Sequence, residues 1–178
     1  MTYSVKCSSQ DAIKALCLIH EIFETKDVLY IGGLVDSHWI GWPGLGDMDL
    51  IIPSSLTSTD KFDFFTKMVD LKASDSIISG AGWFHITGID ASCLRHYVGS
   101  LFGLRIDVFT VDDFDAYRGH CVSLPCGMLI TDRRRRMDIL RNIISLPAHL
   151  CDPRSVRWLE RKKAVASSKL SVYCGTLL

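Results

Sequence analysis

Asp47 and Asp49 are the residues of this sequence whose type and spacing most directly suggest chemistry. They alternate with apolar residues in GDMDLIIP, which is predicted to form a strand, so both side chains point to one face of a sheet. Their Cβ atoms would lie about 6–7 Å apart, where two bare charges repel by roughly 2.5 kcal/mol at an effective dielectric of about 20. Such a pair requires solvent, protonation or a cation, and a hard divalent cation such as Mg²⁺ is the natural counter-ion.

A third carboxylate lies in another β-prone segment. Asp107 is inside LRIDVFTV, where a lone charge would be unfavourable to bury. One interpretation is an ion pair with Arg105, which shares its face of the strand. The interpretation that we prefer places Asp107 across the sheet from Asp47 and Asp49, with Arg105 neutralising the cluster or contacting a phosphate.

A pair of glycines, Gly32 and Gly33, ends the predicted strand VLYIGG. Without a Cβ, a backbone can approach a bulky anion closely and offer its N–H groups to it. A double glycine alone more often marks a tight turn, and an Asp-x-Asp alone is more often a solvated pair of charges. The combination, flanked by strands, favours a site for a metal-bound phosphate.

The elements that would position these residues are helices and strands in mixed order. Helices are predicted over residues 10–25, 59–72, 131–146 and 152–170, and strands over residues 28–33, 46–53, 74–80, 82–88 and 104–111. This pattern predicts an α+β fold, in which a small mixed β-sheet is flanked by helices and followed by a helical C-terminal extension. We expect residues 1–120 to form the catalytic core and residues 121–178 a helical part packed on it, in one compact unit. Asp152 is the expected N-cap of the last helix, with Pro153 at its first position.

Composition narrows the function classes. The 178 residues carry a formal net charge of zero, whereas a protein that lives on nucleic acid usually has a basic excess, so a nucleic-acid partner is not expected. No apolar run reaches the length of a membrane span and the N-terminus lacks an apolar signal core, so we expect a cytoplasmic protein with no membrane partner. The seven cysteines are scattered and include no CxxC pair, which favours reduced thiols over disulfides or a zinc site.

The glycine pair, thirteen further residues, Asp47-Met48-Asp49-Leu50 and the later Asp107 together resemble the signature of the nucleotidyltransferase superfamily related to polymerase β. The motifs look most like those of the minimal and antibiotic-modifying members, such as aminoglycoside and lincosamide nucleotidyltransferases. The resemblance implies that the three acids bind two Mg²⁺ ions and that a nucleoside monophosphate passes from an NTP, with ATP as the expected donor, to a hydroxyl. It also implies that Gly32 and Gly33 cradle the phosphates.

The sequence departs from that pattern near the glycines. Many members have Gly-Ser, whereas Gly33 stands in the place of the serine, and Ser37 is the candidate to contact a phosphate instead. Trp39 and Trp42 can stack on a base or an aromatic substrate, but packing in a core or lid is the commoner role of a tryptophan. We expect Asp36 to cap a helix that begins at Ser37, rather than to take part in catalysis.

Other polar residues have ordinary interpretations beside functional ones. A solvated helix start is the leading interpretation of the run Arg133 to Arg136, with at least one arginine turned inward; a triphosphate, RNA or a protein partner is the alternative. His38 and His85 can serve as acid or base, but are more often ordinary hydrogen-bonded residues. Asp112, Asp113 and Asp115 follow the strand of Asp107 and are expected in a turn and a helix start; a general base among them is the alternative.

The sequence therefore predicts a metal-dependent nucleotidyltransferase acting on a small-molecule acceptor, with Asp47, Asp49 and Asp107 as catalytic metal ligands. Gly32, Gly33, Ser37 and Arg105 are the predicted nucleotide-binding residues. One alternative is NTP-independent biosynthetic chemistry in the same acidic pocket, since folds are reused for new reactions. Another is a non-catalytic module, either a nucleotide sensor or an antitoxin-type partner. A homo-oligomer is compatible with all three.

Overall fold

The computed structural model describes residues 10–74, 82 and 95–175. The chain divides into two compact units, which we call the sheet unit (Met1–Ser74 with Arg95–Asp132) and the helical unit (Asp75–Leu94 with Arg133–Leu178). The predicted strands over residues 74–80 and 82–88, together with His85, lie almost wholly outside the described residues. The α+β fold predicted from the sequence is confirmed: a mixed sheet with helices, and a helical C-terminal part.

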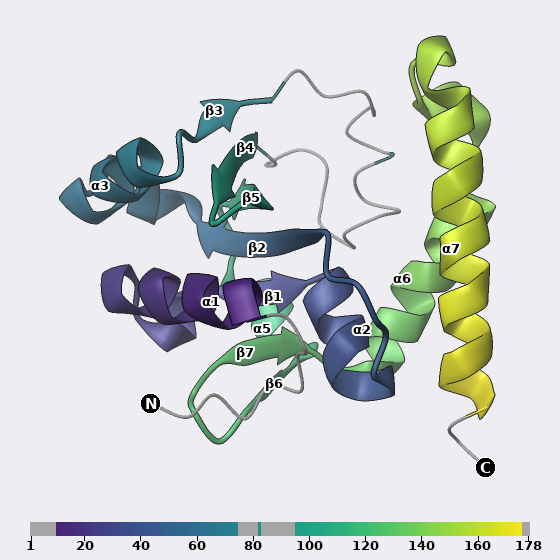
Figure 1. The fold of residues 1–178 in the computed structure, drawn as a ribbon, viewed down its shortest axis with the longest axis horizontal. Coiled ribbons are helices and arrows are strands. Elements are labelled where there is room, and N and C mark those ends of the chain that lie inside the picture. Colours follow the sequence, from purple (N-terminus) through teal and green to yellow (C-terminus); the bar gives the residue numbers. More distant parts are fainter. Residues whose placement is uncertain (1–9, 75–81, 83–94, 176–178) are drawn as a thin grey trace. The chain divides into compact units, whose positions relative to one another are not determined.

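Within the described residues, the sheet unit contains a seven-stranded sheet in the order β3-β4-β5-β2-β1-β7-β6 (Figure 1). β2 pairs in parallel with β5 and antiparallel with β1, and β4 pairs antiparallel with β5. The strands that carry the three predicted acids, β2 and β5, are therefore neighbours in the interior of the sheet. The strand bounds are β1 (Leu29–Ile31), β2 (Asp47–Pro53), β3 (Lys72–Ala73), β4 (Arg95–Leu101), β5 (Leu104–Val111), β6 (Cys121–Ser123) and β7 (Leu129–Thr131).

Four α-helices are described in the sheet unit: α1 (Gln10–Ile22), α2 (Gly33–Ile40), α3 (Asp60–Met68) and α5 (Asp115–Arg118). Short 3₁₀ turns at Thr25–Asp27 and Ser54–Ser58 follow α1 and β2. α3 begins where the sequence predicts, because the Thr59 side chain accepts a hydrogen bond from the Phe62 N–H, 3.3 Å away.

One face of the sheet forms the apolar core. Alternate residues of β2 and β5 are fully buried on this face, because side chains two apart in a strand point the same way. α1 runs beside β1 and β2 (Figure 1) and contributes apolar residues at helical spacing to the same core. These core residues are Leu16 and Ile19 of α1, Met48, Leu50 and Ile52 of β2, and Ile106 and Val108 of β5.

The helical unit, as far as it is described, is built on α6 (Arg133–Ser145) and α7 (Val156–Gly175). α7 buries a narrow stripe of residues seven apart, Leu159, Ala166 and Tyr173. Asp152 caps a 3₁₀ turn, Pro153–Ser155, that leads into α7, and not α7 itself as predicted; its Oδ1 accepts a hydrogen bond from the Arg154 N–H at 2.9 Å. No helix in the described part of the chain is long and apolar enough to cross a membrane.

A partly buried histidine on α1 is expected to make the stability of the sheet unit depend on pH. His20 lies 3.0 Å from the hydroxyl of Tyr30, and burial, partly opposed by a hydrogen bond with the Phe23 backbone, lowers the pKa of His20 to about 4. Between pH 6.5 and about 4 the unfolded chain therefore binds a proton that the folded chain does not, so stability falls as the pH falls through this window. Allowing for partial exposure, we expect a loss of about 1–2 kcal/mol.

Urea unfolding at pH 7 and pH 4.5 measures this loss. His20→Gln keeps a polar partner for Tyr30 but does not titrate, so its free energy of unfolding should fall less over the same interval, by about 1–2 kcal/mol. Equal pH dependence in the two proteins would show that His20 is not the group responsible.

Candidate metal centre

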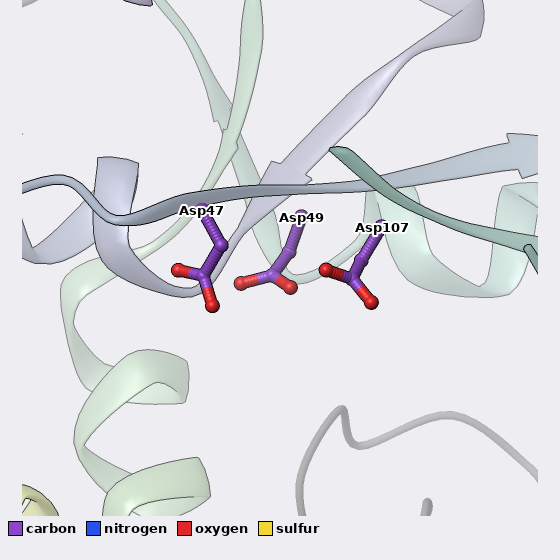
Figure 2. A group of neighbouring side chains, drawn as sticks. All are labelled: Asp47, Asp49 and Asp107. Atoms are coloured by element: carbon purple, nitrogen blue, oxygen red, sulfur yellow. The ribbon is translucent and has the colours of Figure 1, made fainter. Parts of the chain in front are cut away.

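β2 and β5 place three acids on one face of the sheet. The parallel register aligns Asp49 with Asp107, and Asp47 with Arg105. Since residues two apart share a face, the three acids emerge on the face opposite the apolar core. Figure 2 shows the three carboxylates side by side and pointing in one direction.

The spacing of the three carboxylates fits divalent cations. One oxygen of each lies within 4.8 Å of the others; Asp107 is buried, and Asp47 and Asp49 are partly exposed. A single Mg²⁺ bound at about 2.1 Å holds oxygens up to about 4 Å apart, and two ions about 3.5–4 Å apart hold a slightly wider set. The acids thus offer hard oxygen ligands, at a suitable spacing, with a side open to solvent.

Gly32 provides the space that Asp49 occupies. Its φ of +69° with ψ of −136° is a conformation that L side chains rarely adopt. A Cβ at this position would collide with Asp49 Oδ2 and would lie only 2.9 Å from Asp49 Cγ. The close approach expected at the glycine pair is therefore present, with a carboxylate of the chain itself against the glycine. Contact of Gly32 with a phosphate stays a prediction.

Gly33 is the first residue of α2, and the start of this helix adjoins the acids. A Cβ on Gly33 would lie 3.7 Å from Asp47 Oδ1. The N-terminus of a helix carries partial positive charge and exposed N–H groups, which suit a phosphate. Ser37 lies one turn further into α2 and is buried.

The expectation that Asp36 caps a helix beginning at Ser37 is wrong. α2 begins at Gly33, and Asp36 is a fully buried residue within its first turn. The glycine conformation at Gly32 turns the chain directly from β1 into the helix, so the helix starts before the polar residues that suggested a cap.

Asp107 is held by two cationic or hydrogen-bonding side chains. Arg105 contacts both of its oxygens, with Nε 2.6 Å from Oδ2 and Nη2 2.9 Å from Oδ1. His96 Nε2, from β4, lies 2.7 Å from Oδ1. Burial alone would raise the pKa of the Asp107 carboxyl, but the hydrogen bonds with His96 and Arg105 and the charge of Arg105 leave this pKa below its usual value. Asp107 is therefore ionised at neutral pH.

Both interpretations of Arg105 from the sequence describe part of what the structure contains. Arg105 pairs with Asp107, as the simpler interpretation predicts, and Asp107 also lies beside the other two acids. The hydrogen bond to Asp107 raises the pKa of Arg105, partial burial opposes this, and the charges of all three acids add to it. Arg105 is thus the counter-ion of the whole cluster when no metal is bound.

Replacing Arg105 should make the stability of the protein more dependent on divalent metal. Arg105→Gln removes the counter-ion from three neighbouring carboxylates; since the Arg105 side chain is 56% exposed, we expect a loss of about 1 kcal/mol, or 2–4 °C in Tm, without metal. Added Mg²⁺ should recover most of this loss. Thermal unfolding with EDTA and with MgCl₂ measures both; the same Mg²⁺-dependent change in Tm in both proteins would contradict the prediction.

The structure gives ordinary roles to several other residues that the sequence singled out. Trp39 packs against the core and donates its indole N–H to the Thr131 carbonyl at 3.0 Å, as the packing interpretation predicts. Asp113 accepts a hydrogen bond from the Ala116 N–H at the start of α5, consistent with the expected turn. In the arginine run, Arg136 is buried, which confirms the inward-facing member.

His96 is the residue that the sequence analysis missed. Its segment, RHYVGSL, was not predicted as a strand, and the histidine has no motif around it. Its position becomes informative only through the antiparallel register of β4 and β5, which sets His96 opposite Phe109, two residues from Asp107.

Comparison with solved structures shows a likeness in fold. No protein-family model matches the sequence, and no curated protein matches it. The chain is similar to the crystal structure of the Megavirus polyadenylate synthase, with a TM-score of 0.57 and 15% sequence identity over 97% of this chain. The chain has a nucleotidyltransferase-type fold.

This likeness has defined limits. The chain spans about a third of the length of the Megavirus protein, since the match covers 36% of that protein. At 15% identity the likeness shows the fold alone. It supports the nucleotidyltransferase-like fold expected from the sequence, and it does not support the antibiotic-modifying subgroup.

Proposed function

We propose that this protein transfers a nucleoside monophosphate from an NTP to a hydroxyl in a metal-dependent reaction. A bond forms between the acceptor oxygen and the α-phosphorus, the bond from that phosphorus to the bridging oxygen breaks, and pyrophosphate leaves. The hydroxyl proton is released to a base or to water. ATP is the expected donor.

The observation that carries this proposal is the convergence of Asp47, Asp49 and Asp107 on one face of the sheet, with one oxygen of each within 4.8 Å of the others. Three carboxylates at this distance repel one another when charged, and Arg105 supplies a single positive charge beside them, so the arrangement favours further cations. Gly32 accommodates Asp49 in a backbone conformation available to few residues other than glycine. The proximity of the three carboxylates and the strained glycine beside Asp49 thus both support this cluster as the functional site.

The roles of the residues follow from their positions. Asp47, Asp49 and Asp107 would hold Mg²⁺, which supplies charge neutralisation at the phosphate oxygens and lowers the pKa of an attacking hydroxyl. The backbone at Gly32 and Gly33 would approach the phosphates at the start of α2. Arg105, largely exposed at its side chain, can leave Asp107 and bind a phosphate oxygen.

A small-molecule hydroxyl is the acceptor that we propose first, because the motifs resemble those of antibiotic-modifying nucleotidyltransferases. The test is incubation of the protein with each α-labelled NTP, Mg²⁺ and a panel of aminoglycosides, lincosamides and other polyols. A labelled product with equimolar pyrophosphate supports the proposal. Turnover of an acceptor without NTP would favour the NTP-independent alternative, and magnesium-dependent NTP binding without turnover would favour a nucleotide sensor.

A polynucleotide hydroxyl is the second candidate, because charge is distributed very unevenly along the chain. Residues 133–178 contain eleven lysines and arginines but only three aspartates and glutamates, which gives a formal charge of +8. Residues 1–132 contain nine lysines and arginines and seventeen aspartates and glutamates, which gives a formal charge of −8. Charge asymmetry of this size is typical of proteins that bind nucleic acid. The Megavirus neighbour is named a polyadenylate synthase, which is consistent with such an acceptor.

The acceptors are distinguished by extension of a labelled RNA oligonucleotide in the same assay, at 50 and 200 mM salt. Arg157 and Arg161 are exposed on α7, so charge reversal of both should weaken RNA binding several-fold if the helical unit holds the RNA. Reversal of Lys61, exposed on α3, is the matched control. Absence of RNA extension, together with a labelled small-molecule product, excludes this candidate.

A further inference from the structure

The strand neighbouring the acidic site contributes a buried histidine that the proposed reaction does not use directly. His96, on β4, and Asp107, on β5, have side chains only 6% and 7% exposed, and His96 Nε2 lies 2.7 Å from Asp107 Oδ1. A carboxylate ionised at neutral pH can only accept hydrogen bonds. The Nε2 atom of His96 therefore carries the proton and donates a hydrogen bond to Asp107 Oδ1.

The His96 ring is fixed in place by an aromatic contact. It stacks on the Phe109 ring with a centroid separation of 4.6 Å and an interplanar angle of 10°. His96 and Phe109 are direct partners in the antiparallel register, and Phe109 follows Asp107 by two residues on the same strand face. The backbone that positions the acid therefore also positions its hydrogen-bond donor.

The two partners of Asp107 differ in their freedom to move. The Arg105 side chain is 56% exposed, so it can rotate away when a cation arrives, whereas the His96 side chain is enclosed. Arg105 also donates a hydrogen bond to each Asp107 oxygen, and a metal ion would compete for the lone pairs that accept these bonds. Of the two contacts, the one from His96 can persist while a metal is bound.

We propose that His96 is a positioning residue, which fixes the orientation of the Asp107 carboxylate so that a divalent cation meets it in a defined geometry. This inference rests on the proposed metal site. Hydrogen-bond partners of metal ligands typically change metal affinity by about 10–100-fold when they are removed, because the free ligand becomes disordered or reorients.

Two substitutions separate the hydrogen bond from the packing. His96→Phe keeps an aromatic ring against Phe109 but loses the donor, and His96→Gln keeps an N–H donor near the position of Nε2 but loses the ring. Binding of Mn²⁺ to the full chain without nucleotide is measured by calorimetry. We expect His96→Phe to weaken Mn²⁺ binding about tenfold or more and His96→Gln to stay within about threefold of the wild type.

His20→Phe is the matched control. His20 contacts Tyr30, which pairs with Leu50 and so belongs to the opposite face of the sheet from the acids. Its Mn²⁺ affinity should equal that of the wild type. Circular dichroism of each variant establishes that it is folded at the temperature of the titration.

The Mn²⁺ affinities of the variants distinguish a role of His96 in positioning Asp107 from a role in packing alone. Weaker Mn²⁺ binding in His96→Phe with near-normal binding in His96→Gln supports the positioning role. If both folded variants bind Mn²⁺ as the wild type does, His96 serves packing alone and the inference is overturned while the metal site stands. If the wild type binds no Mn²⁺, the proposed metal site and this inference are both overturned.

Discussion

Asp47→Asn is expected to lower turnover by about 10³-fold or more, which corresponds to roughly 4 kcal/mol of transition-state stabilisation. Asparagine has the shape of aspartate but offers no charge to a divalent cation, so the loss should come from metal and triphosphate binding and not from altered packing. Asp47 is partly exposed, and its carboxylate lies beside those of Asp49 and Asp107. Removing one of three like charges should leave the stability of the metal-free protein unchanged or raise it by about 1 kcal/mol.

The combination of lost activity and retained stability distinguishes a functional acid from a structural one. Turnover is measured by pyrophosphate release, and stability by urea unfolding in EDTA. Asp63→Asn, at an exposed position of α3, is the matched control and should leave both quantities unchanged. Normal turnover by Asp47→Asn would contradict a role of the acidic cluster in the proposed reaction.

Asp107→Asn is a less clean version of the same test. It removes the negative charge that accepts hydrogen bonds from His96 and Arg105, and it turns an amide N–H₂ group toward one of these donors. A loss of stability of about 2–3 kcal/mol would accompany any loss of activity, because hydrogen bonds to charged groups contribute about that much. A loss of activity at Asp107 is therefore interpretable only beside the result for Asp47.

The acidic site could be predicted from the sequence because its determinants are local. Two-residue periodicity alone sets Asp47 and Asp49 on one face, and the apolar residues around Asp107 identify a strand. Their convergence also needs the two strands to be parallel neighbours in register, as the structure has them; the sequence predicted only that Asp107 lies across the sheet from the other two acids. The position of Asp36 could not be predicted, because the start of α2 depends on the backbone conformation at Gly32.

The partners of the site were not predictable in the same way. β4, β6 and β7 are short or rich in polar residues, so their sequences carry weak strand signals, and pairing with neighbouring strands defines them. His96 acquires a role only through such pairing, since it stands eleven residues from Asp107 in the chain. The role of a single histidine depends on its burial and on its hydrogen bonds to other strands, and neither can be inferred from the residues next to it in the sequence.

The net charge of the whole chain does not show how charge is distributed along it. A net charge of zero led to the expectation that nucleic acid is not a partner, yet the zero is the sum of −8 over residues 1–132 and +8 over residues 133–178. Since fields act locally over about a Debye length of 8–10 Å, a partner responds to the charge of the surface that it meets. The choice between a small-molecule and a polynucleotide acceptor therefore depends on the helical unit as well as on the acids.

Gly32→Ala is expected to abolish divalent-metal binding, or weaken it by about 100-fold, whereas Gly33→Ala should change it by less than about threefold. Alanine at residue 32 is strained twice: its φ of +69° is unfavourable for an L side chain, and its Cβ would collide with Asp49 Oδ2. The backbone or the Asp49 carboxylate must move, and either change separates Asp49 from the other two acids. At residue 33 the nearest atom to a new Cβ is Leu45 Cδ1 at 3.0 Å, the end of a flexible side chain that can yield.

The two variants thus form a matched pair. Both replace a glycine at the start of α2, but only the change at Gly32 displaces Asp49, so a difference in metal affinity between them reports on the acids. Mn²⁺ titration of both variants is the measurement, with circular dichroism to confirm folding. The positive φ alone should reduce the stability of Gly32→Ala by about 1–2 kcal/mol, which a folded domain of ordinary stability can tolerate. Folded Gly32→Ala with wild-type Mn²⁺ affinity would mean that the position of Asp49 against the glycine is irrelevant to the cation, and support for the metal centre would then rest on the convergence of the acids alone.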